Sequence, residues 1–213
     1  MPTDNIPTYA MVRNEFVNWS KFANENQWAT GALVKKSSSN VPGDCVAIYY
    51  VVDNDKKEIL QKLFVTSWNK LYQPDFKKLN LHWVSTLFKV EASDVKQLEH
   101  PEETILAPGG QILFILEEDH NVAGTVSAVI HDGVCELGKM AVGDAYQGKG
   151  YAHPLMRECI SWAKRQGYPD MTIYSNDSLV KAINLYKKYG FVTTHLGAHP
   201  RYERVNIIMS LKF

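Results

Sequence analysis

The sequence has few cysteines, no net charge and no long apolar run. Cys45, Cys135 and Cys159 are odd in number and far apart, which predicts reduced thiols rather than a disulfide framework or a zinc site. The 23 basic and 23 acidic residues cancel, and without a basic block no nucleic-acid partner is expected. No apolar run is long enough to predict a membrane span, and residues 1–9 lack a signal-peptide pattern. These absences favour a cytoplasmic protein with no membrane partner.

Two common nucleotide-binding motifs are also missing. The P-loop pattern G-x-x-x-x-G-K-[ST] occurs nowhere in the chain, so a nucleoside triphosphatase is not expected. The dinucleotide pattern G-x-G-x-x-G needs a third glycine after Gly148 and Gly150, and His153 stands at that place. The next strand ends in Ser175 and Asn176, where an acidic ribose ligand should stand. A nicotinamide-dependent dehydrogenase is therefore not expected either.

The length and composition indicate one α/β unit with a short head. The chain has 213 residues, of which 45% are hydrophobic, enough for one sizeable core. A turn-rich stretch at 35–44 separates residues 1–44 from the rest. About 40 residues rarely fold alone, so 1–44 is expected to be an extension that packs on a body of residues 45–213.

Hydrophobic periodicity predicts the elements of the body. Strands are expected over 45–52, 122–130, 134–142, 171–175 and 206–213, and helices over 56–72, from near 149 or 150 to 166, and over 179–189. Asp132-Gly133 between two apolar runs predicts a hairpin. Pro74 is expected to end the first helix and Gly190 the last.

Residues 147–152, Gln-Gly-Lys-Gly-Tyr-Ala, lie where a predicted strand gives way to a predicted helix. The two glycines remove the Cβ atoms that would keep a ligand from the backbone. The first N–H groups of a helix have no intrahelical partner, and together with the helix dipole they attract an anion. The pattern predicts a phosphate-binding loop, and the alternative is an ordinary tight turn.

Two spaced strings carry a resemblance to a known family. Residues 147–152 read Q-x-x-G-x-A, and residues 182–191 read A-x-x-L-Y-x-x-x-G-F. In this order the two strings resemble the signatures of the GNAT superfamily of acetyl-CoA-dependent N-acetyltransferases. The resemblance implies an α/β (α+β) fold with a mixed, mostly antiparallel central sheet and helices on both faces. It also implies acetyl-CoA as co-substrate and no metal.

The resemblance implies a set of cofactor-binding residues. These are the backbone groups of Met140, Ala141 and Val142, which would pair with the pantetheine arm, and Gln147, Gly148, Lys149, Gly150, Tyr151 and Ala152, which would bind the pyrophosphate. Asn176 is a further candidate, although it could instead cap the next helix. Many family members have an asparagine seven residues before the signature tyrosine, and this chain has Leu179 there. The asparagine contact therefore stays unassigned.

Two catalytic residues follow from the same resemblance. Glu136 would be the base that takes a proton from the acceptor amine, because an amine with a pKa of about 10.4 is almost fully protonated at neutral pH. Tyr186 would donate a proton or hydrogen bond to the leaving thiolate. The alternatives are a solvated edge glutamate and a core aromatic. Period two in 134–142 puts Glu136 and Met140 on one face and Leu137 and Lys139 on the other.

These residues together predict transfer of acetyl to an amine by direct attack. A covalent route through Cys135 would need a thiol of low pKa, and no cationic neighbour in the sequence provides one. Two other classes stay open, a catalytically silent acyl-CoA sensing module and an interaction domain that keeps only the fold. A small-molecule amine is favoured as acceptor over a protein, with a peptide also open. The oligomeric state is open, a homodimer included.

Overall fold

The computed structural model describes residues 28–31, 44–53, 55–200 and 202–213. The expectation for 1–44 falls outside these residues except at Trp28–Gly31 and residue 44. Residues 28–31 form a strand that pairs antiparallel with the strand that begins at Cys45. The predicted first strand of the body is therefore the second strand of the sheet.

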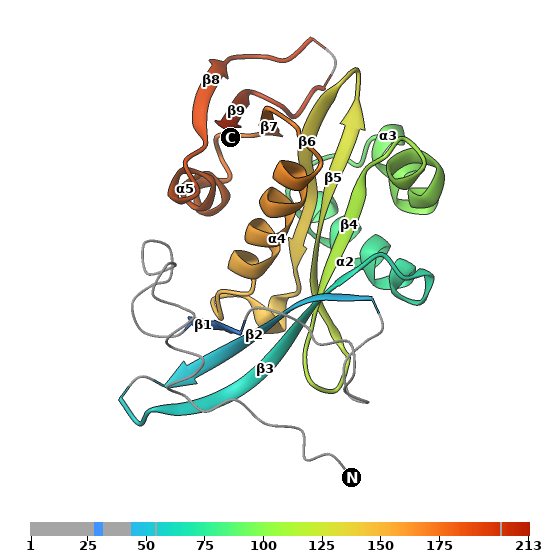
Figure 1. The fold of residues 1–213 in the computed structure, drawn as a ribbon. Coiled ribbons are helices and arrows are strands. Elements are labelled where there is room, and N and C mark those ends of the chain that lie inside the picture. The colour runs from blue at the N-terminus through green and yellow to red at the C-terminus, as the bar shows by residue number, and fades with distance from the viewer. Residues whose placement is uncertain (1–27, 32–43, 54, 201) are drawn as a thin grey trace.

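The described residues form a nine-stranded sheet in the order β1-β2-β3-β4-β5-β6-β7-β9-β8 (Figure 1). The strands are β1 (Trp28–Gly31), β2 (Cys45–Asp53), β3 (Glu58–Ser67), β4 (Gln111–Leu116), β5 (Val122–His131), β6 (Val134–Val142), β7 (Asp170–Ser175), β8 (Val192–Leu196) and β9 (Ile207–Lys212). All neighbours pair antiparallel except β6 and β7, which are parallel. A mixed, mostly antiparallel sheet was the predicted arrangement, and it is confirmed.

Helices cover both faces of this sheet, as predicted. They are η2 (Lys70–Tyr72), α2 (Gln73–Leu87), α3 (Ala92–Glu99), the π-helical turn η3 (Glu102–Leu106), η4 (Asp144–Tyr146), α4 (Ala152–Arg165) and α5 (Val180–Lys188). One hydrophobic cluster joins α4 and α5 to the sheet through residues such as Leu155 and Ile183. A second joins α2, α3 and η3 through Phe76, Leu98 and Ile105. Figure 1 shows α4 in front of the sheet, with α2 and α3 beside and behind β4.

The predicted helix over 56–72 is wrong, because this stretch forms β3 and then η2. Its apolar residues fit a helical stripe, but Leu63 and Val65 join the cluster on one face while Phe64 joins the cluster on the other. A strand buried on both faces loses the simple alternation that marks a strand. Pro74 therefore does not end a helix; it stands at the start of α2, where a missing N–H is tolerated.

The predictions for the second half of the chain are confirmed with small shifts. Asp132 and Gly133 both have positive φ, 49° and 78°, in the two-residue turn between β5 and β6, as such a hairpin requires. Helix α4 begins at Ala152 rather than near 149 or 150. Pro154 is then its third residue, and its missing N–H falls among those that lack an intrahelical partner.

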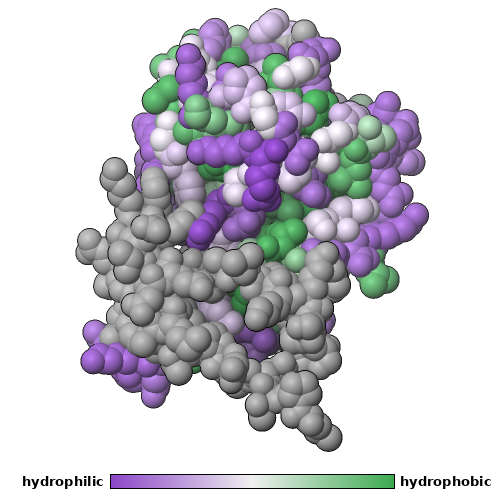
Figure 2. All heavy atoms as spheres, viewed as in Figure 1, coloured by the Kyte–Doolittle hydropathy of each residue, from purple (hydrophilic) through white to green (hydrophobic). Residues whose placement is uncertain are grey.

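The described surface mixes polar and apolar side chains. Figure 2 shows hydrophilic residues around smaller hydrophobic areas on one face. Within the described residues, no helix is both long enough and apolar enough to cross a bilayer.

Candidate active site

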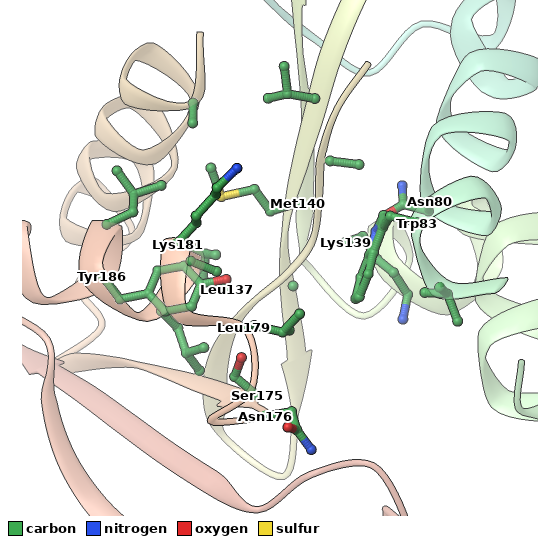
Figure 3. A pocket seen from close by; sticks show the side chains of 18 of the residues that line it. Asn80, Trp83, Leu137, Lys139, Met140, Ser175, Asn176, Leu179, Lys181 and Tyr186 are labelled. Atoms are coloured by element: carbon green, nitrogen blue, oxygen red, sulfur yellow. The ribbon is translucent and has the colours of Figure 1, made fainter. Parts of the chain in front are cut away.

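A cleft of about 690 Å³ lies where β6 and β7 separate, between α2 and α3 on one side and α4 and α5 on the other. Its lining includes every predicted site residue except Lys149. Figure 3 shows the cleft from close by, with Tyr186 on one side of β6 and Asn80 and Trp83 on the other. Segments that are far apart in the sequence thus meet at one place.

The cleft exists because β6 and β7 are paired over a very short distance. Their register contains one residue pair, Glu136 with Thr172, whereas β5 and β6 are paired along most of their length. Beyond Glu136 the two strands diverge. The backbone of Met140, Ala141 and Val142 on the β7 side therefore faces the cleft. An extended ligand with its own amide groups can pair there as an added strand.

A β-bulge corrects the predicted faces of β6. Thr125 pairs with Ala141 and Ser127 with Gly138, so Lys139 and Met140 together oppose one residue of β5. Lys139 has a φ of 48°, which is unusual for a residue with a side chain. An extra residue reverses the alternation that follows it. Met140 therefore packs with the cluster that contains Leu137, and Lys139 points to the face of Glu136, where it reaches Asp94 on α3.

Glu136 is a half-buried carboxylate at the base of the divergence. Its Oε2 lies 3.6 Å from Nδ1 of His131, and its side chain is 21% exposed. Burial raises the pKa of Glu136, and the nearby charges of Lys139, His131 and Arg204 act in the opposite direction. A carboxylate of raised pKa is a stronger base than one in water.

Gly138 leaves room for this carboxylate. A Cβ atom at position 138 would lie 3.1 Å from Oε1 of Glu136, closer than ordinary van der Waals contact. The two residues are on the same face of β6, one step before the bulge. Any side chain at 138 would therefore push the Glu136 carboxylate away by a few tenths of an ångström.

Tyr186 approaches the cleft from the opposite face of the sheet. It is on α5, is 8% exposed, and belongs to the same hydrophobic cluster as Leu137. Figure 3 shows its side chain directed from α5 toward β6. Burial raises the pKa of Tyr186 to about 12. Its hydroxyl thus keeps its proton at neutral pH and can donate it or a hydrogen bond.

The predicted phosphate loop has an open backbone. Gly148 and Gly150 both have positive φ, 76° and 79°, and a Cβ on Gly148 would meet no atom within 4 Å. In the described part of the chain, no acceptor is in hydrogen-bonding position for the N–H groups of Gly148, Lys149 and Gly150. These donors, at the start of α4, fit an anion.

Three of the predicted cofactor-binding side chains already have other contacts. Nζ of Lys149 lies over the ring of Tyr146, at 5.4 Å from its centroid. The Tyr151 hydroxyl donates to Gln61 or Glu117, both at 2.8 Å. Tyr151 lines the cleft and Lys149 does not, and both side chains are held by these contacts. Nδ2 of Asn176 donates to the Arg204 carbonyl at 2.7 Å.

The interpretation of Asn176 as a helix cap is wrong. Helix α5 begins after Leu179, which lies between Asn176 and the helix, and no side chain caps it. Oδ1 of Asn176 instead accepts from the N–H of Ser178 at 3.0 Å. Both ends of the amide are thus bonded to protein, and a cofactor contact for Asn176 stays a prediction.

A buried ion cluster lines the α3 side of the cleft, and the sequence did not indicate it. Arg204 donates from Nη1 and Nη2 to the two oxygens of Asp94, at 2.5 and 2.8 Å, and Nζ of Lys139 donates to Asp94 at 3.2 Å. Asp94 is 2% exposed. Burial alone would raise the pKa of Asp94, but the hydrogen bonds from Arg204 and the charge of Lys139 outweigh burial and lower it.

Two further cleft residues on α2 were also missed. Asn80 is 1% exposed, and both Asn80 and Trp83 line the cleft. Asparagine is a poor helix former, so its place in the middle of a helix is the one local signal that could have singled out Asn80.

Other chemistries find little support in the described residues. Burial raises the pKa of the Cys135 thiol to about 12, which disfavours a thiolate nucleophile. No group of three or more His, Cys, Asp or Glu side chains that could hold a metal ion occurs among the residues that the structure describes.

The comparisons with known proteins agree with this geometry. The model of the acetyltransferase (GNAT) family matches residues 61–191, more than half of the chain, and the chain therefore belongs to this family. N-acetylaspartate synthetase from Rattus norvegicus is 28% identical over 137 residues, which are 63% of this chain and 43% of that protein. The chain thus spans less than half the length of this curated relative.

Solved structures share the fold. A GNAT-family acetyltransferase from Staphylococcus aureus Mu50 has a TM-score of 0.63 at 20% sequence identity. The match covers 70% of this chain and 98% of the acetyltransferase chain. Spermidine N-acetyltransferase from Vibrio cholerae, in complex with CoA and spermine, has a TM-score of 0.55 at 16% identity and covers 70% of this chain and 95% of its own.

Proposed function

We propose that this protein transfers the acetyl group of acetyl-CoA to a primary amine of a small molecule by direct attack. The divergence of β6 and β7 carries the proposal, because it brings an unpaired strand backbone, an open glycine loop, Glu136 and Tyr186 to one cleft. Family membership and relatives whose names describe amine acetylation support it.

We expect the cleft to bind the pantetheine arm, the pyrophosphate and the thioester of acetyl-CoA. The pantetheine arm would pair with the backbone of Met140, Ala141 and Val142, and its pyrophosphate would accept hydrogen bonds from the N–H groups of residues 147–152. One backbone N–H of β6 would also donate to the oxyanion that forms at the thioester carbon. The side chains of the two predicted catalytic residues stand on opposite faces of the sheet.

The proposed reaction removes two protons from the acceptor nitrogen and gives one to sulfur. Glu136 takes the first proton from the ammonium form of the acceptor and releases it to solvent, and the neutral amine attacks the thioester carbon. The nitrogen of the tetrahedral intermediate loses its second proton to Glu136 as the intermediate collapses and the carbon–sulfur bond breaks. The Tyr186 hydroxyl donates a hydrogen bond to the departing sulfur of CoA, or donates its proton and regains one from solvent. No covalent acyl-enzyme is needed.

A catalytically silent acyl-CoA sensing module remains the alternative function. The half-buried carboxylate of raised pKa favours the enzyme, since sensing alone does not need a base in the cleft. A cytoplasmic location, a peptide acceptor and a homodimer stay predictions from the sequence.

The test is free-thiol release from acetyl-CoA in the presence of amines, amino acids, aminoglycosides and peptides, with the acetylated product identified by mass. Thiol release that depends on the acceptor would support the proposal. Saturable binding of acetyl-CoA without release from any acceptor would favour the sensing module.

A further inference from the structure

Asn80 and Trp83 have buried polar atoms that lack a protein partner. Among the described residues, no group forms a hydrogen bond with Oδ1 of Asn80 or with Nε1 of Trp83. Both residues line the cleft. A buried polar atom without a partner is costly. Because both atoms belong to residues that line one cleft, a ligand there would supply what they lack once the groups that cover them move aside.

The orientation of the Asn80 amide is fixed. Its Nδ2 donates to the carbonyl of Phe76 at 2.9 Å, and a carbonyl can only accept. The amide therefore cannot be turned over without loss of this bond, and Oδ1 is left as an acceptor. Trp83 is three residues farther along α2, which makes the two side chains neighbours on the helix surface. Asn80 offers Oδ1 as an acceptor, and Trp83 offers its Nε1–H as a donor.

This pair faces the side of the cleft where the acceptor amine must lie. Figure 3 shows Asn80, Trp83 and Lys139 on one side of β6, and Tyr186 on the other. Glu136 and Lys139 share that face of the strand, because the bulge turns Lys139 toward Asp94. A pantetheine arm that pairs as an added strand lies in the plane of the sheet, with its amides bonded to β6. Helix α2 forms a wall of the cleft on one side of that plane.

We infer that Asn80 and Trp83 bind the acceptor, and that the acceptor is an α-amino acid. This inference rests on the proposed function and names its substrate class. The protonated amino group donates to Oδ1 of Asn80 while its proton passes to Glu136. The carboxylate on the same carbon accepts from Nε1–H of Trp83.

A polyamine does not fit this wall. Ammonium groups only donate hydrogen bonds, so a polyamine would satisfy Asn80 and leave the Trp83 N–H unpaired. A site that binds a substrate oxygen rejects an analogue without that oxygen, because its own polar groups are then left unpaired.

The test compares amino acids with the amines that their decarboxylation gives, such as histidine with histamine, lysine with cadaverine and alanine with ethylamine. Amino-acid amides form a third arm, which separates a free carboxylate from the carbonyl of a peptide. We expect kcat/KM for at least one amino acid to exceed that of its decarboxylated partner by roughly 100-fold or more, and to exceed that of its amide.

Two variants locate the effect. Trp83→Phe keeps an aromatic ring and removes the N–H. It should raise KM for the amino acid about tenfold, the loss of one hydrogen bond to a charged group, and leave KM for acetyl-CoA unchanged. Trp68→Phe is the matched control, because Nε1 of Trp68 donates to Glu102 at 3.4 Å outside the cleft. It should change neither value.

Three results would overturn the inference. Equal or faster acetylation of the decarboxylated amines would exclude an amino acid as the preferred acceptor, while the proposed acetyltransferase function would stand. A rise of KM for acetyl-CoA in Trp83→Phe would assign the pair to the pantetheine arm. No thiol release with any acceptor, despite binding of acetyl-CoA, would remove the proposed function and this inference with it.

Discussion

Glu136 pairs with Thr172 where β6 and β7 run parallel, and beyond this pair the two strands separate. The carboxylate expected to act as base is thus at the point where the sheet opens. Its neighbour Leu137 packs toward Tyr186 on the opposite face. An acceptor amine on the α2 side and the thioester sulfur near α5 would then approach each other from opposite faces of β6.

The glycine loop provides a test of cofactor binding. Gly148→Asp puts a negative charge where the pyrophosphate is expected and should raise the Kd for acetyl-CoA at least tenfold, about 1.4 kcal/mol. Isothermal titration calorimetry measures this value.

Gly167 offers a matched control for this change. It has a φ of 83°, close to that of Gly148, and a Cβ there also meets no atom within 4 Å. Gly167→Asp adds the same charge and similar backbone strain at the far end of α4, and should leave the Kd unchanged. Equal affinities for both variants would argue against a phosphate site at 147–152.

Tyr186→Phe tests the role of the hydroxyl at the leaving thiolate. We expect kcat to fall by about 100-fold, with little change in the Kd for acetyl-CoA. Because the pKa of Tyr186 is raised to about 12, its ionisation should not lower kcat of the wild type over the neutral to mildly alkaline range. Thiol-release assays of the wild type and of Tyr186→Phe at a series of pH values measure kcat.

Tyr189 is the comparison residue, since it lies one turn from Tyr186. Its hydroxyl donates to the His153 carbonyl at 3.0 Å. Tyr189→Phe should lower the free energy of unfolding by about 1 kcal/mol without the loss of kcat. If both variants lose kcat equally, the hydroxyl of Tyr186 has no special role.

The buried ion cluster predicts a pH-dependent stability. The pKa of Asp94 is lower in the folded protein than its ordinary value, so its contribution is present above the unfolded pKa and lost as the pH falls through the folded pKa. Asp94→Asn removes the carboxylate that Arg204 and Lys139 share, while Arg204 keeps its ion pair with Glu91 at 3.3 Å, and it should cost about 3 kcal/mol at neutral pH.

The difference between wild type and Asp94→Asn should therefore shrink as the solution becomes acidic. Urea unfolding at a series of pH values measures it. A difference that is constant with pH, or absent at neutral pH, would show that the Asp94–Arg204 pair contributes little to stability.

Local patterns predicted most of the second half of the chain, although not strand β8. The Asp132-Gly133 turn, the stripe of α4 and the strings around Gly148 and Tyr186 each depend on residues close in sequence. These features placed the loop, the helices and most of the site residues in order. The fold class followed from the family resemblance that the two strings carry.

The errors and omissions have longer-range causes. Strand β3 is buried on both faces, and only its partners β2 and β4 decide its structure. The bulge at Lys139 depends on its register with β5, and Asp94 meets Arg204 across 110 positions. The unpartnered atoms of Asn80 and Trp83 can be recognised only when the cleft is known. The hydrophobic periodicity of a single segment does not reveal these long-range contacts.

The pH profile of kcat/KM for thiol release tests the central claim most directly. It should be measured for the wild type, for Glu136→Gln and for Glu103→Gln, whose side chain is exposed and outside the cleft. Because burial raises the pKa of Glu136, the acidic limb of the wild type should lie above the ordinary range of a glutamate. Glu136→Gln should lose roughly 100-fold or more in rate and lose this limb, while Glu103→Gln keeps both. A Glu136→Gln protein with the rate and acidic limb of the wild type would contradict the account.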